Sequence, residues 1–239
     1  MADPFGRAVR DHHLGEREHP LIDRDGDTTR EHPIERFYFD GVGDADLAWL
    51  TERLSGPLLE TGAGAGRHAL VLQERVETVA TEVSEHLVRT MRERGVADAR
   101  HADMFDLRAQ FEADRFRSAF ARGTQVGLAG SLDALTEFLQ DLAHVTTTRA
   151  TAVLDAMDPE HERAADLIGY RSDPTPGLAY RTYHERYRDE VGETMLFRLF
   201  SPERFRQATL DTAWHVTAVR RSNASSAHYQ VALSKRRPA

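Results

Sequence analysis

Apolar and polar positions alternate through the middle of the chain in blocks that indicate strands followed by helices. Segments with apolar residues at helical spacing predict helices at residues 84–94 and 131–144. Short apolar runs predict buried strands at residues 58–61, 77–83, 116–121 and 149–157, with a brief further strand that ends at Asp103. This alternation is typical of an α/β protein with a doubly wound, mostly parallel sheet.

The chain changes character after residue 157. Residues 178–187 and 193–200 predict two strands, and Ser201 followed by a proline predicts the start of a short helix. Residues 214–222 and 228–236 form a candidate hairpin through residues 223–227. We expect one core and no second domain, since 239 residues suffice for a single α/β domain.

The sequence LLETGAGAGRHAL, residues 58–70, carries the main functional signal. It places Gly62, Gly64 and Gly66 between a predicted strand and a predicted helix. Without Cβ atoms, such a turn can bend sharply and let a ligand approach its amides, and the following helix adds a positive dipole end. The turn therefore predicts a nucleotide-type cofactor.

The position of the last glycine separates two kinds of cofactor. In dinucleotide-binding folds, a small residue lies three positions after the second glycine, but here that position is Arg67. Gly66 instead follows Gly64 by two residues, and Glu60 precedes Gly62 by two residues. This ExGxGxG stretch resembles motif I of the class I S-adenosylmethionine (SAM)-dependent methyltransferases.

The resemblance implies a Rossmann-like methyltransferase fold with SAM as cofactor and a seven-stranded sheet closed by an antiparallel C-terminal strand, for which residues 228–236 fit. It assigns Glu60 to the methionine ammonium, Glu82 to the ribose hydroxyls and Asp103 to the adenine amino group. Glu82 could instead be a helix-capping acid, and Asp106 is a near alternative to Asp103. The predicted cofactor-binding residues are Glu60, Thr61, Gly62, Ala63, Gly64, Gly66, Arg67, Glu82, Val83, Asp103, Met104, Ala121, Arg122 and Gly123.

Composition narrows the function classes. The chain has no cysteine, which excludes disulfides, thiolate metal sites and a cysteine nucleophile. A net charge of −8 argues against nonspecific nucleic-acid binding, and the loop ARGTQVG at residues 121–127 lacks the Asn/Asp-Pro-Pro-Tyr/Phe pattern of enzymes that methylate base amino groups. No apolar run approaches a membrane span, and the start resembles no signal peptide, so we expect a soluble, cytoplasmic protein without nucleic-acid or membrane partners.

The first 33 residues are polar and predict an arm, flexible or lid-like, ahead of a single SAM-binding domain at residues 34–239. Its histidines, His12, His13, His19 and His32, include no HxxxH pair, so we expect no metal site. Arg36 and Tyr38, in the aromatic segment 32–39, are candidates for a lid over the cofactor.

The acceptor site is less well defined by the sequence. If the acceptor is a hydroxyl or an ammonium, a histidine or a carboxylate would help to remove its proton. The predicted strand 178–187 offers His184, Glu185 and Tyr183 as candidate catalytic residues. Strand alternation puts Tyr183, Glu185 and Tyr187 on one face and His184 on the other, and the sequence does not say which face meets the cofactor.

The leading hypothesis is a SAM-dependent methyltransferase that acts on a small-molecule acceptor. One alternative is an NAD(P)-dependent oxidoreductase, which would share the strand, the glycine turn and Glu82. The other is a non-catalytic SAM-binding protein, because a fold does not fix a function.

Overall fold

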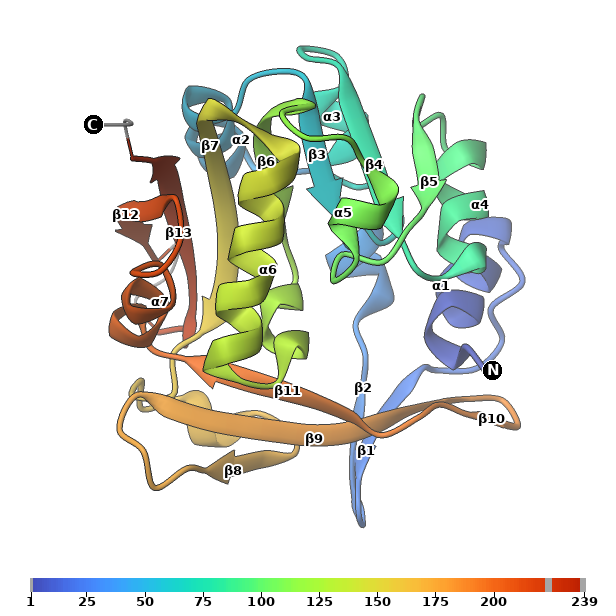
Figure 1. Ribbon diagram of the computed structural model, residues 1–239. Coiled ribbons are helices and arrows are strands. Elements are labelled where there is room, and N and C mark those ends of the chain that lie inside the picture. The colour runs from blue at the N-terminus through green and yellow to red at the C-terminus, as the bar shows by residue number, and fades with distance from the viewer. Residues whose placement is uncertain (1, 222–224, 237–239) are drawn as a thin grey trace.

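The computed structural model describes residues 2–221 and 225–236. Its main sheet has seven strands in the order β12-β13-β7-β6-β3-β4-β5 (Figure 1). Strand β13 is antiparallel to both of its neighbours, whereas the pairs from β7 to β5 are parallel. The strands are β3 (Leu58–Thr61), β4 (Thr78–Glu82), β5 (Ala99–His101), β6 (Phe116–Ala121), β7 (Thr146–Met157), β12 (Trp214–Arg220) and β13 (His228–Lys235). The predicted fold class, with its antiparallel C-terminal strand, is confirmed.

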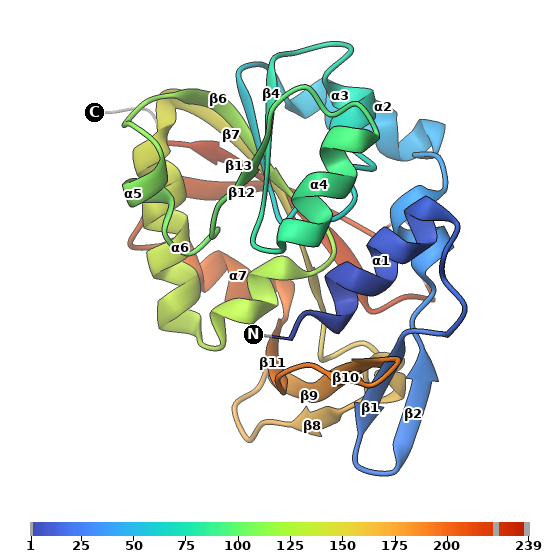
Figure 2. The same ribbon diagram turned by 90° about the vertical axis from the view of Figure 1, so that its right-hand side faces the viewer.

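Helices cover both faces of this sheet. Buried residues of α5, α6 and α7 share one apolar cluster with the strands, while those of α2, α3 and α4 belong to separate clusters on the other side (Figure 2). The helices are α2 (Asp44–Arg53), α3 (Ala69–Leu72), α4 (Glu85–Glu93), α5 (Leu107–Gln110), α6 (Leu132–Val145) and α7 (Pro202–Ala208), with short 3-10 turns at η2 (Gln125–Ala129) and η3 (Ala164–Asp166). The sequence predicted α4, α6 and α7 but missed α2 and the short α5.

A second sheet lies beyond the carboxyl ends of the parallel strands (Figures 1 and 2). Its path is β10-β9-β1-β2, and β8 and β11 also pair with β9. These strands are β1 (Ile22–Asp25), β2 (Thr28–Glu31), β8 (Tyr170–Ser172), β9 (Leu178–Tyr187), β10 (Glu190–Val191) and β11 (Met195–Phe200). The sequence predicted β9 and β11, but not that they join an N-terminal hairpin in a sheet of their own.

The N-terminal residues pack against the rest of the molecule. Helix α1 (Pro4–Leu14) and the π-helical segment η1 (Glu35–Phe39) flank the β1-β2 hairpin. Ala8, Val9 and Leu21 are fully buried in a cluster that also contains Leu87 of α4 and Tyr187 of β9. The described part of the predicted arm, residues 2–33, thus contains a helix and a hairpin, and its closure over a cofactor stays a prediction.

The segment after the glycine turn is less helical than the sequence predicts. The helix expected after the glycine turn extends only over α3, because residues 64–68 form turns. The predicted connection at residues 223–227 lies partly outside the described residues. Within the described part of the chain, no helix is long and apolar enough to cross a membrane.

Candidate functional site

The glycine turn follows β3 directly and has the backbone that its sequence predicts. Gly62, Gly64 and Gly66 all have positive φ angles, of 61°, 58° and 78°. A Cβ at Gly62 would lie 2.8 Å from Cγ of Gln125, and one at Gly64 would lie 3.1 Å from the Tyr38 ring. Glycine is needed here both for the left-handed conformation and for the close approach of these side chains.

Glu60 occupies the middle of β3 and is 1% exposed. Its Oε2 atom has no hydrogen-bond partner among the described residues. Burial raises the pKa of the Glu60 carboxyl to about 8. When it is ionised, the buried Glu60 carboxylate needs a cation or a hydrogen-bond donor beside it, because a buried charge without a partner is costly.

Glu82 ends β4 beside the same turn. Its carboxylate accepts hydrogen bonds from the amides of Gly64, at 3.0 Å, and Val83, at 2.8 Å. Burial raises the pKa of Glu82, and these amide bonds oppose the rise. The structure therefore ties Glu82 to the glycine turn, and carboxylate lone pairs remain for further donors.

The residues that follow β5 differ in exposure. Asp103 is exposed and accepts a hydrogen bond from the Phe105 amide at 2.9 Å, while Met104 is buried. Val83 is 56% exposed. The acids at the ends of β4 and beyond β5 lie along one edge of the sheet, where ligands of open α/β sheets bind.

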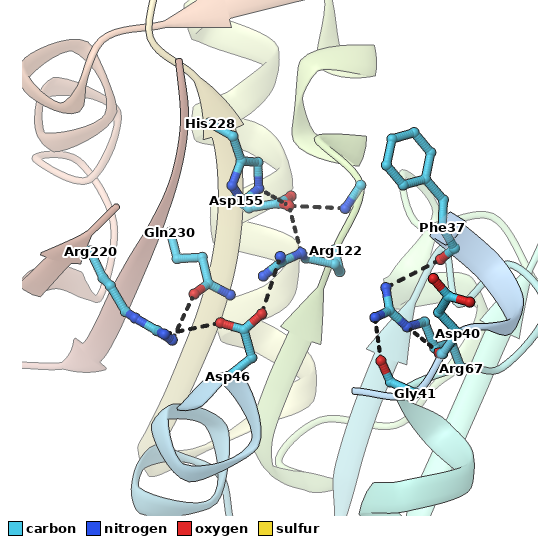
Figure 3. A network of polar contacts seen from close by, with 11 residues as sticks. Phe37, Asp40, Gly41, Asp46, Arg67, Arg122, Asp155, Arg220, His228 and Gln230 are labelled. Carbon is cyan, nitrogen blue, oxygen red and sulfur yellow. Dashed lines mark hydrogen bonds and ion pairs between the residues drawn. The ribbon is translucent and has the colours of Figure 1, made fainter. Parts of the chain in front are cut away.

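Arg67 fastens the N-terminal segment to the glycine turn. Its Nε donates to the carbonyl of Asp40 at 2.8 Å, and its Nη2 donates to that of Gly41 at 2.6 Å (Figure 3). These bonds hold the end of η1 next to the turn, with the Tyr38 ring against Gly64. Arg67 was predicted to bind the cofactor. In the structure its guanidinium donates hydrogen bonds to backbone carbonyls just after η1.

The loop after β6 is held by Asp155, a buried residue of β7 that the sequence analysis missed. Its carboxylate accepts hydrogen bonds from the amides of Gly123, at 3.0 Å, and Thr124, at 2.7 Å. It also pairs with His228 at 2.7 Å (Figure 3). Burial alone would raise the pKa of Asp155, but the His228 bond, the Arg122 charge and the amides hold it below its usual range.

The same network extends to the far side of the sheet. Nε of Arg122 lies 3.5 Å from Asp155, and its Nη2 lies 3.7 Å from Asp46 of α2. Asp46 also pairs with Arg220 at 3.0 Å (Figure 3). Asp155 and His228 are 73 residues apart, so local patterns could not pair them. The available signal was the position of Asp155 near the end of a predicted strand.

The acceptor candidates of β9 lie on opposite faces. In the pairing of β9 with β1, Glu185 lies opposite Asp23, and His184 lies opposite Arg24. His32 lies 3.1 Å from Asp23 and 3.2 Å from the Tyr38 hydroxyl, which places the Glu185 face on the side of the glycine turn. Glu185 and Tyr183 therefore face Tyr38, and His184 faces away.

Burial changes the acidity of this face. It raises the pKa of Glu185 to about 8, with a further contribution from Asp23. Burial also raises the pKa of the Tyr38 hydroxyl well above its ordinary value, with a further contribution from the acids around it. The tyrosine hydroxyl therefore keeps its proton at neutral pH.

The strand order of the main sheet, with helices on both of its faces, defines the class of fold. The chain has the fold of the class I SAM-dependent methyltransferases. Over 98% of its length, it is similar to a SAM-dependent methyltransferase from Bacteroides fragilis in complex with S-adenosyl-L-homocysteine. The match covers 94% of that chain at 22% identity and a TM-score of 0.79.

Two further solved structures share the fold. The CcbJ methyltransferase from Streptomyces caelestis matches 84% of this chain and 96% of its own, at 18% identity and a TM-score of 0.62. The sugar N-methyltransferase KedS8 from Streptoalloteichus matches 76% of this chain and 80% of its own, at 16% identity and a TM-score of 0.54. No protein-family model and no curated protein sequence matches this chain.

Proposed function

We propose that the protein is a SAM-dependent methyltransferase that acts on a small-molecule acceptor. The observation that carries the proposal is Glu60, whose buried Oε2 has no hydrogen-bond partner within the described residues and which lies two residues before Gly62. A cofactor that presents an ammonium group to this carboxylate would supply the missing charge and donor. SAM has such a group at its methionine end.

Further support comes from the two acids at the sheet edge. Glu82 is held by the Gly64 and Val83 amides in a position where it can accept from hydroxyl groups of a ribose. Asp103 and Met104 follow β5 at the next position along the edge, and would meet the adenine. The fold comparisons agree, since the Bacteroides fragilis structure contains S-adenosyl-L-homocysteine.

The acceptor side points to a small molecule. Tyr38 packs against Gly64 of the glycine turn, Glu185 and Tyr183 lie near enough to affect the Tyr38 hydroxyl, and the second sheet lies beyond the carboxyl ends of the parallel strands (Figure 2). Methyl transfer needs side chains that exclude water and position a nucleophile for in-line attack on the sulfonium methyl group, and these residues are candidates for that role. Amino sugars are the first acceptors to try, because one similar structure is a sugar N-methyltransferase.

The experiment is calorimetric titration of the purified protein with SAM, S-adenosylhomocysteine, NAD and NADP, at low and at molar salt. We expect binding of the first two compounds alone. Binding of NAD or NADP alone would replace the proposal by the oxidoreductase alternative, to which the fold comparisons give no support. Silence from all four compounds would contradict both functions.

Glu60→Gln tests the assigned contact with little change in side-chain shape. We expect SAM to bind about ten- to a hundredfold more weakly, because a hydrogen bond to a charged group contributes about 1.5 to 3 kcal/mol. The control is Glu74→Gln, which changes an exposed acid and should leave the dissociation constant unchanged. If Glu60→Gln and Glu74→Gln bound SAM with equal affinity, Glu60 would not contact the methionine ammonium.

Methyl transfer is then measured with radiolabelled SAM against amines and hydroxyl compounds, beginning with amino sugars. Transfer to any of them separates an enzyme from a non-catalytic SAM-binding protein. SAM binding without transfer to any member of the panel would favour the non-catalytic alternative.

A further inference from the structure

Three metal-ligating side chains meet in the second sheet. One ligand atom each from Asp23 of β1, His32 and Glu185 of β9 lies within 4.8 Å of the other two. Asp23 and Glu185 are direct partners in the register of β1 with β9. His32 follows β2, and its amide donates to the Leu21 carbonyl at 2.8 Å, which closes the hairpin. Backbone pairing therefore fixes all three positions.

Two acidic side chains meet in this cluster, and the charge of Arg181 also acts on Glu185. When both acids are ionised, carboxylates that face each other across an antiparallel pair repel one another. Asp23 is 6% exposed and bonds to Nδ1 of His32 at 3.1 Å. The Glu185 carboxylate is partly buried, and within residues 2–221 and 225–236 it forms no hydrogen bond or ion pair. A cation between the two strands would complete the set.

We propose that Asp23, His32 and Glu185 bind a divalent first-row transition-metal ion. One imidazole nitrogen and two carboxylate oxygens suit ions such as Mn²⁺, Fe²⁺, Co²⁺ and Zn²⁺, whereas Ca²⁺ and Mg²⁺ prefer oxygen ligands alone. The 3.1 Å between Asp23 and His32 Nδ1 is about the separation of neighbouring ligands that each lie about 2.1 Å from one ion. Three protein ligands leave positions for water or for an acceptor atom.

The ion would also act on residues that pack against the glycine turn. With Nδ1 of His32 on the metal, its Nε2 would carry the proton and donate to the Tyr38 hydroxyl, 3.2 Å away. Tyr38 packs against Gly64, so the ion would fix the hairpin and η1 against β9, next to the glycine turn. The sequence missed this set because its members come from β1, from the residue after β2 and from β9 rather than from one helix face.

The test is metal binding by the intact chain. Protein freed of metal with a chelator and dialysed is titrated with MnCl₂ and with ZnCl₂ by calorimetry, and bound metal is counted by elemental analysis. We expect one ion per chain, bound at least tenfold more weakly by Glu185→Gln and by His32→Asn. The control is His13→Asn, because His13 also lies near a carboxylate, Glu93 at 3.7 Å, but belongs to no such three-residue set in the described chain.

No bound ion in the wild type, or equal binding by the wild type and both site variants, would overturn the proposal. So would an equal loss in His13→Asn, since it would indicate nonspecific surface binding. X-ray absorption of the zinc-loaded wild type needs no variant and should show one imidazole in a nitrogen and oxygen shell. A shell with no imidazole, or with several, would also overturn it. SAM binding is measured separately, and its failure would concern only the proposed function.

Discussion

At the scale of single residues, the protonation state of Glu60 is the property that SAM binding should change most. Its pKa of about 8 lies above the ordinary glutamate value, so at pH 7 the ligand-free protein holds this carboxyl mostly protonated. The folded pKa is raised, and the stability that this group contributes is therefore present in acid and lost as the pH rises through about 8. An ammonium group beside Glu60 would reverse that preference.

This predicts that SAM binding releases a proton from Glu60 near neutral pH. Between pH 6 and 7, the affinity should rise by up to about tenfold per pH unit, because the ionised carboxylate is the form that binds. Calorimetry in two buffers of different ionisation enthalpy measures the protons released. Glu60→Gln should show a smaller release, and an identical release by both proteins would contradict the assignment.

Asp155 is the opposite case, an acid whose pKa is held low by its partners. Its stabilising effect is present at neutral pH and lost as the pH falls and the carboxylate is protonated. Asp155→Asn should lower the free energy of unfolding at pH 7 by about 1.5 to 3 kcal/mol, as a charged acceptor of several hydrogen bonds is lost. Urea unfolding measures this.

The control for Asp155 is Asp141→Asn, which breaks a surface ion pair with Arg108. Surface pairs contribute about 0 to 1 kcal/mol. A loss at Asp155 no larger than that at Asp141 would mean that the loop after β6 does not depend on this carboxylate.

At the scale of elements, the glycine turn joins β3 to the helices behind the sheet. Gly66 and Gly95 both have positive φ angles, of 78° and 95°, so alanine would be strained at either position. A Cβ at Gly66 would also lie 2.6 Å from Cγ2 of Val96, whereas one at Gly95 would have no atom of the described chain within 4 Å.

Gly66→Ala should therefore destabilise the protein by about 1 to 3 kcal/mol more than Gly95→Ala does, the usual effect of overpacking a close contact. Denaturant unfolding of the two variants gives the difference directly. Equal losses would mean that backbone strain alone sets the requirement for glycine in the turn.

The elements that the sequence predicted are those whose signals are local. Strand β6 is an apolar run within the sequence itself. Glu60 lies next to the glycine turn, and Glu82 ends its strand, so both could be found from their immediate neighbours. The hairpin β1-β2 has no such signal, because its strands IDRD and TTRE are mostly polar and its place depends on β9, more than 150 residues later. The same distance separates Asp23 from Glu185.

At the scale of the whole molecule, the N-terminal helix and hairpin join the two sheets. Helix α1 buries Ala8 and Val9 against α4 and β9, and β1 covers one edge of β9. Burying one aliphatic side chain contributes about 1.5 to 3 kcal/mol, and a typical domain is stable by only about 5 to 15 kcal/mol. A segment with several such side chains therefore carries a large share of the stability.

Two substitutions within α1 distinguish this packed segment from a free arm. Val9→Ala, at a fully buried position, should cost about 1 to 3 kcal/mol because it removes two methyl groups and leaves a cavity. Leu14→Ala, at a position 45% exposed near the end of the same helix, should cost less than about 0.5 kcal/mol.

Deletion of residues 1–33 should then leave a protein that no longer unfolds in one cooperative step. If the deleted protein kept the wild-type melting temperature and Val9→Ala matched Leu14→Ala, the N-terminus would be an independent arm, and the second sheet would have to be stable without its hairpin.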